Sequence, residues 1–260
     1  MNFFFGIKSD IINCKLSIPK FKNTGEILYN ISLYSAEIDN NKNKWKIVKI
    51  ENDEDENFFI LNNNSFNNEK VFFLGKKKDF SKDENENGDI FLSSLRNFNK
   101  YTDTEPQFRA NFKIFNEFGF SSYQSDYPFS MIDKNGNILS PLNILLNKNS
   151  QKNFIFFKNL FFKPIQEEFN IYFINYKLKK IITIKKIFTN KLNIIEVEKN
   201  LLEDNMYIFS DRYVGIPLFV SINNDSISLE HTHPPHHYLL DDAKFKIIKQ
   251  KKNEFIEIIS

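Results

Sequence analysis

Apolar and polar residues alternate with a period of two in many short segments of the chain, which is the spacing of a β-strand with one buried face. In residues 27–33 every odd-numbered residue is apolar, whereas Asn30 and Ser32 are polar, and this pattern predicts a half-buried strand. Similar apolar or alternating segments follow at residues 45–50, 70–74, 109–115, 154–162, 170–175, 181–188, 192–197, 206–209 and 216–222. The chain is therefore predicted to consist mainly of short strands.

Polar connectors, rather than long amphipathic helices, separate the predicted strands. The longest of them, at residues 51–57, 62–68 and 76–89, consist mainly of Asn, Asp, Glu and Lys, which is the usual composition of solvated loops. Short strands joined by such loops predict an all-β, mainly antiparallel fold, a β-sandwich or a barrel. They argue against a parallel α/β sheet.

One helix is predicted at the end of the chain, because apolar residues recur there at spacings of three and four from Phe245 to Ile259. Asp241 is the expected N-cap. A strand over residues 244–248 is the alternative, since the lysines come early and the glutamates late, opposite to the order that the helix dipole favours. The fold is expected to contain at most one or two short helices.

A length of 260 residues allows one large β domain or two smaller β lobes. The polar segment 76–90 is the best candidate for a connector, and it is expected to be exposed and mobile. We therefore expect an N-terminal β region over residues 1–90 that ends in this connector. A C-terminal β domain over residues 91–260 would carry the histidines.

The composition excludes several classes of protein. With 35 Lys and Arg against 33 Asp and Glu, and only three arginines, the chain lacks the basic excess of a general nucleic-acid binder. No two of the seven glycines have the spacing of a phosphate-binding loop, so no nucleotide cofactor is expected. The single Cys14 excludes an internal disulfide and fits a reducing, cytoplasmic location. No apolar stretch approaches the length of a membrane span.

A histidine cluster is the strongest candidate for chemistry, because all four histidines lie within residues 231–237. Residues 223–226, Asn-Asn-Asp-Ser, predict a tight turn between two antiparallel strands. By period two, His231 and His233 then share the apolar face of the second strand, whereas Glu230 points away. The turn predicts four opposed pairs: Ile222 and Ile227, Val220 and Leu229, Leu218 and His231, and Ile216 and His233.

Two imidazoles two residues apart on a strand are a recurrent ligand pair for zinc, iron or manganese. Two prolines follow them and end the strand, so that the chain turns and brings further ligands within reach. The cluster therefore predicts a divalent transition-metal site. The alternative is a polar strand cap whose imidazoles bond to backbone or water. The predicted ligands are His231 and His233, with a third from His236, His237, Asp241 or Asp242.

Aromatic and arginine side chains supply candidate contacts to a ligand. Residues 118–128 combine aromatic rings, among them Tyr123 and Tyr127, with Ser, Gln and Asp, a composition that suits a sugar-like or other polar ligand. A strand that runs into a turn explains the same residues. Arg212 and Tyr213 come just before the first strand of the histidine hairpin, where they are expected to orient an anionic or hydroxylated substrate.

The sequence is compatible with three classes of function. The first is a metal-binding β-sandwich protein that acts as a metal-dependent enzyme on a small polar substrate, with the reaction left open. The second is a non-catalytic β-sandwich module that binds a glycan or a protein partner. The third is a structural subunit that docks on an assembly through residues 244–260. Elemental analysis for bound metal separates the first class from the second, and the mass in solution tests the third.

Overall fold

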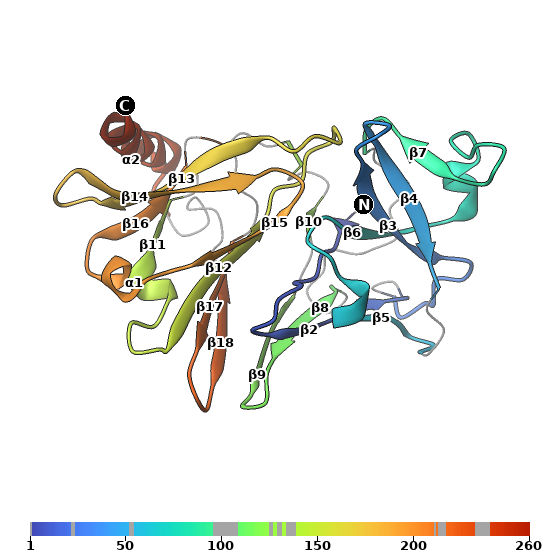
Figure 1. Cartoon of the computed structure of the whole chain (residues 1–260), viewed down its shortest axis with the longest axis horizontal. Helices are drawn as coiled ribbons and strands as arrows, with labels where there is room; N and C mark the ends of the chain where they lie inside the picture. The colour runs from blue at the N-terminus through green and yellow to red at the C-terminus, as the bar shows by residue number, and fades with distance from the viewer. Residues whose placement is uncertain are drawn as a thin grey trace. The chain divides into compact units, whose positions relative to one another are not determined.

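The computed structural model describes residues 2–21, 24–51, 55–95, 109–124, 127–128, 132–133, 139–210, 212, 217–231 and 240–260. Within these residues the chain forms eighteen β-strands and two α-helices, and the strand pairing is mainly antiparallel (Figure 1). The predicted all-β class is therefore confirmed. No helix in the described part of the chain combines the length and the apolar character that crossing a bilayer requires.

The chain divides into two compact units. Unit 1 contains Met1–Asp133, Leu160–Gln166 and Thr189–Leu192, and unit 2 contains Lys134–Asn159, Glu167–Phe188 and Asn193–Ser260. Each unit is compact, but compactness does not show that a unit folds on its own as a domain. The division into domains at residues 1–90 and 91–260 therefore stays a prediction.

Unit 1 holds two four-stranded sheets, in the orders β5-β2-β8-β9 and β6-β3-β4-β7, and the short pair β1-β10. Its strands are β1 (Asn2–Phe3), β2 (Asn13–Pro19), β3 (Ser32–Asp39), β4 (Lys44–Ile50), β5 (Phe58–Asn62), β6 (Val71–Gly75), β7 (Ile90–Leu92), β8 (Asn111–Phe115), β9 (Phe120–Gln124) and β10 (Tyr127–Pro128). Alternation explains strand β2, in which Cys14, Leu16 and Ile18 are all buried.

The strand predicted at residues 27–33 is wrong over most of its length, because β3 begins only at Ser32. Tyr29, one of the apolar residues of the pattern, is 73% exposed. Asn30 adopts a φ of 57°, which lies in the left-handed region and interrupts an extended strand. Asparagine tolerates this conformation, so a turn overrides the alternating pattern here.

The polar segment 76–89 joins β6 to β7 and contains a short 3₁₀ helix, η2 (Lys77–Phe80). Phe80 is only 1% exposed, and its ring centroid lies 4.6 Å from that of Tyr34 on β3. The buried side chain of Phe80 therefore packs this part of the segment against the sheet. The mobility of the rest stays a prediction.

Unit 2 is a sandwich of two four-stranded sheets, ordered β11-β16-β13-β14 and β15-β12-β17-β18. Its elements are β11 (Leu139–Pro141), α1 (Leu142–Leu145), β12 (Lys152–Lys158), β13 (Glu168–Asn175), β14 (Lys180–Phe188), β15 (Leu192–Glu196), β16 (Met206–Phe209), β17 (Leu218–Ile222) and β18 (Ile227–His231). Buried side chains of both sheets form one core cluster, which includes Phe157 of β12, Phe173 of β13 and Phe219 of β17.

Helix α2 (Lys244–Ile259) covers part of the outer face of the sheet that contains β13 (Figure 1). Phe255 is 2% exposed, and its ring centroid lies 5.2 Å from that of Tyr176 and 5.4 Å from those of Tyr207 and Phe209. The predicted terminal helix is therefore confirmed, and the alternative strand over residues 244–248 is wrong.

The start of α2 differs from the expected N-cap. The N-cap residue is Ala243, two positions after Asp241. The Asp241 carboxylate instead accepts a hydrogen bond from the backbone N–H of Ala243 at 2.6 Å, and its carbonyl accepts one from Lys244 N–H at 3.0 Å. Asp241 thus forms the turn before the helix rather than its cap.

Phe255→Ala is expected to lower the free energy of unfolding by roughly 3 kcal/mol, because loss of a buried phenyl ring leaves a cavity among aromatic neighbours. Phe245→Ala is the matched control on the same helix. Phe245 is 63% exposed, so its loss should cost less than about 0.5 kcal/mol. Urea unfolding of both variants measures the difference. Equal losses would show that α2 does not dock through Phe255.

Candidate functional site

Strand β13 carries a polar row on its outer face. Its alternate residues from Phe169 to Phe173 are buried in the sandwich core. The residues between and before them, Glu168, Asn170 and Tyr172, are exposed or half-buried. Because side chains of a strand alternate between faces, these three polar residues lie on the face away from the core.

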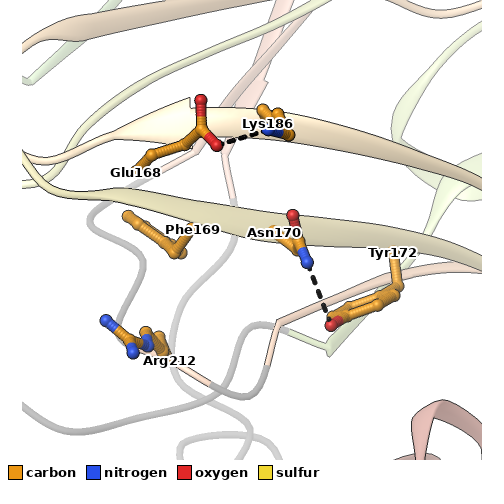
Figure 2. A pocket seen from close by; sticks show the side chains of 6 residues that line it. All are labelled: Glu168, Phe169, Asn170, Tyr172, Lys186 and Arg212. Atoms are coloured by element: carbon orange, nitrogen blue, oxygen red, sulfur yellow. Dashed lines mark hydrogen bonds and ion pairs between the residues drawn. The ribbon is translucent and has the colours of Figure 1, made fainter.

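Strand β14 adds a cation to this row. Its register places Lys186 directly opposite Asn170. Lys186 Nζ lies 2.6 Å from Glu168 Oε1, so the two side chains form an ion pair between the strands (Figure 2). The side chains are 68% and 43% exposed, and such a pair contributes little to stability. Its main effect is to neutralise Lys186 locally.

Ser210 attaches the chain after β16 to β13 and so positions Arg212. The Ser210 hydroxyl donates to the backbone carbonyl of Asn170 at 3.1 Å and accepts from the backbone N–H of Arg212 at 3.2 Å. Ser210 is fully buried, so water does not compete for these bonds. Arg212 is therefore fixed beside the polar row of β13.

Among the residues that the structure describes, Arg212 forms one ion pair, with the carboxylate of Glu167, and this pair is loose. Arg212 Nη1 lies 3.8 Å from Glu167 Oε2, which is longer than a hydrogen bond, and the two side chains are 61% and 52% exposed. A pair of this kind is weak in water. The N–H donors of Arg212 therefore keep their capacity to bind a ligand.

Together these side chains line a pocket of about 370 Å³ (Figure 2). One carboxylate and two cations give the lining a formal charge of +1. Five of its six residues carry hydrogen-bonding groups, and Asn170 Nδ2 already donates to the Tyr172 hydroxyl at 3.4 Å. A small polar molecule fits this volume and lining. The lining consists of Glu168, Phe169, Asn170, Tyr172, Lys186 and Arg212.

The predicted register of the histidine hairpin is confirmed wherever the structure describes it. Asn223 N–H donates to the Ser226 carbonyl at 2.9 Å, which closes the predicted turn. His231 is half-buried on the face of the buried Leu229, whereas Glu230 is exposed. The three described pairs are Ile222 and Ile227, Val220 and Leu229, and Leu218 and His231.

Three of the six predicted metal ligands lie outside the described residues, namely His233, His236 and His237, and so does Tyr213. Asp241 is described, and its carboxylate bonds to the backbone of Ala243. Over the described ranges, no group of three or more His, Cys, Asp or Glu side chains is arranged to hold a metal ion. A metal site around His231 stays a prediction.

Tyr123 and Tyr127 lie in unit 1, on β9 and β10. Neither residue lines the pocket on β13 that contains Arg212. The Tyr123 ring makes an edge contact with Phe112 of β8, with centroids 6.2 Å apart. Tyr127 is 1% exposed, and its hydroxyl accepts a hydrogen bond from the backbone N–H of Leu160 at 3.3 Å. The Tyr123 ring and the Tyr127 hydroxyl each contact a residue of unit 1, and their role in binding a ligand stays a prediction.

Of the pocket residues, only Arg212 was predicted from the sequence. The strand prediction at residues 170–175 began two residues late and so left out Glu168. A signal was nevertheless present, because Glu168, Asn170 and Tyr172 occupy every second position beside a row of buried apolar residues. The contribution of Lys186 depends on strand pairing, which alternation alone does not specify.

Comparisons of the chain with protein-family models, with curated proteins and with solved structures give no match. No family is therefore assigned. The geometry and the chemistry of the pocket on β13 are the grounds for a functional proposal.

Cys14 is 1% exposed, and burial raises the pKa of its thiol to about 12. Because the thiolate is the reactive form, we expect a thiol reagent to label the native chain at least about 100-fold more slowly than the unfolded chain at pH 8. Absorbance of the released chromophore measures both rates, with guanidinium-unfolded protein as the control. Fast labelling of the native chain would contradict the burial of Cys14.

Proposed function

We propose that unit 2 is a binding module for a small hydroxylated anion, such as a sugar acid. The observation that carries the proposal is the lining of the β13 pocket, which combines a net positive charge with neighbouring donors and acceptors. This proposal belongs to the non-catalytic class of binding modules expected from the sequence.

Arg212 supplies the selectivity for an anion. Lys186 is neutralised by Glu168 at 2.6 Å, whereas the Glu167 carboxylate lies 3.8 Å from the guanidinium of Arg212. A planar guanidinium binds a carboxylate or a phosphate through two parallel hydrogen bonds. The position of Arg212 is set by the buried Ser210, so the ligand does not have to order the backbone on binding.

Asn170, Tyr172 and Glu168 supply partners for hydroxyl groups. An amide and a phenol each donate and accept, and a carboxylate accepts from hydroxyl donors. These groups lie on alternate positions of one strand, which spaces them along the outer face of the sheet. The ring of Tyr172 adds an apolar surface for the C–H groups of a sugar-like ring.

Arg212→Gln is expected to weaken the binding of glucuronate by about 10- to 100-fold, because a charge-assisted hydrogen bond is worth roughly 1.5–3 kcal/mol. Isothermal titration calorimetry measures the affinity, with neutral glucose as the comparison ligand. Lys148→Gln is the control, since Lys148 is an exposed cation of unit 2 that pairs with Glu203 at 2.5 Å and does not line the pocket. Equal binding of glucose and glucuronate by the unchanged chain would contradict the proposal.

Metal-dependent chemistry is a second candidate function, and one observation favours it. The pairing of β17 with β18 places His231 opposite Leu218, on the face of the buried Leu229, and by period two we expect His233 to follow on that face. An imidazole in that position is able to act as a ligand to zinc, iron or manganese once further ligands complete the site.

His231→Ala is expected to abolish the retention of metal, because one of two ligands on the strand is lost. Glu230→Ala is the control, since Glu230 points away from His231 and should leave the metal content unchanged. Elemental analysis of untagged protein purified without chelator measures the stoichiometry. If the unchanged chain carries no metal and added zinc, iron or manganese does not raise its melting temperature, the metal proposal is wrong.

A further inference from the structure

Two neighbouring elements of unit 2 are rich in lysine. Residues 176–186 contain five lysines and no acidic residue, and helix α2 contains five lysines and two glutamates. Five positive charges on the first segment and a net three on the helix give +8, whereas the whole chain carries +2. The rest of the chain is therefore net negative by six charges. The positive charge is concentrated on a small part of unit 2.

The two segments meet at Tyr176 and Glu254. Lys251 Nζ donates to the Tyr176 hydroxyl at 2.8 Å and lies 2.9 Å from Glu254 Oε2, and the Tyr176 hydroxyl donates to the same oxygen at 2.5 Å. Hydrogen bonds from Tyr176 and Lys251 lower the pKa of Glu254, and the charge of Lys179 lowers it further. Lysines of the β13–β14 turn and of α2 therefore belong to one surface.

The turn and strand β14, which carry part of this surface, the basic face, also expose aliphatic side chains. Leu178 at the turn is 66% exposed, and Ile182 and Ile184 on β14 are 42% and 47% exposed. Large aliphatic side chains next to cations are typical of surfaces that enter the headgroup region of a bilayer. The basic face is defined by the exposed lysines of the turn and helix: Lys177, Lys179, Lys180, Lys246, Lys249 and Lys251.

We propose that the basic face docks unit 2 on a membrane surface rich in anionic phospholipid. Clusters of four to eight basic residues beside apolar side chains bind anionic lipid through diffuse charge attraction. All the cations of this face are lysines, which act as point charges, whereas nucleic-acid recognition favours arginine forks and stacking aromatic rings. The exposed apolar side chains at the turn and on β14 are aliphatic rather than aromatic, so a lipid surface fits better than a nucleic acid.

Flotation of the full chain with vesicles tests the proposal. We expect binding to phosphatidylcholine vesicles that contain about 30% phosphatidylserine to exceed binding to pure phosphatidylcholine by at least about 10-fold. Because charges at a surface are screened by salt, the binding should fall as the salt concentration rises from about 0.1 M to about 0.5 M. Equal binding to both kinds of vesicle, or none to either, would overturn the proposal.

Charge reversal locates the contact. Lys177→Glu with Lys180→Glu should lower binding to the anionic vesicles by at least about 10-fold. The control, Lys77→Glu with Lys78→Glu on η2, makes the same change in net charge with two exposed lysines of unit 1 and should bind like the unchanged chain. Equal loss in both double variants would overturn the assignment to the basic face.

Further measurements separate loss of the membrane contact from loss of the fold and from binding to a nucleic acid. Thermal unfolding of each double variant shows that the fold is retained, and Leu178→Ser should weaken vesicle binding several-fold at unchanged charge, because an exposed apolar side chain is lost. Fluorescence anisotropy with a labelled single-stranded oligonucleotide tests the alternative that the basic face binds a nucleic acid. Tighter binding to the oligonucleotide than to anionic vesicles, lost in the same Lys177 and Lys180 variant, would replace the lipid partner by a nucleic acid.

Discussion

The ring of Phe255 holds helix α2 against the outer face of the sheet that contains β13, and the use of that face depends on this contact. One face of the sheet is already buried in the sandwich core, through residues such as Phe173. The other face is apolar around Ile174 and Phe209, and exposing it to water would be costly. The helix covers this apolar part with a stripe of side chains spaced three and four residues apart.

The part of the same face next to the helix is polar and open. Tyr172 belongs to both regions, because it packs against the Phe255 cluster and also lines the pocket. From there Asn170 and Glu168 continue along β13 as alternate polar residues, and Arg212 is fixed beside them through Ser210. A rigid sheet thus carries the polar groups, which keeps the entropy cost of binding low.

Local features of the sequence predicted part of this arrangement well. The register of β17 and β18 follows from a four-residue turn and a period of two, and both are local properties, so the opposition of Leu218 and His231 was predictable. The spacing of apolar residues likewise predicted helix α2. The turn at Asn30 shows the limit of such patterns, since a left-handed residue ends a strand that alternation would continue.

The pocket depends on contacts between distant parts of the chain, and alternation does not specify these. The bond from Ser210 to Asn170 joins residues 40 positions apart, and the pairing that brings Lys186 to Glu168 depends on the register of β13 and β14, which includes a bulge at Phe173 and Ile174. The sequence therefore indicates individual polar residues that could bind a ligand, but it does not indicate which of them lie together in the pocket.

Solvent accessibility on the two parts of this face is the most direct measurement. A soluble paramagnetic agent broadens NMR signals of exposed groups, and we predict strong broadening of the Asn170 side-chain amide and little of the Ile174 methyl groups, which are 0% exposed. In Phe255→Ala the Ile174 methyls should become broadened as well, because the helix no longer covers them. Equal broadening of both groups in the unchanged chain would contradict the division of the face into a covered apolar part and an open polar pocket.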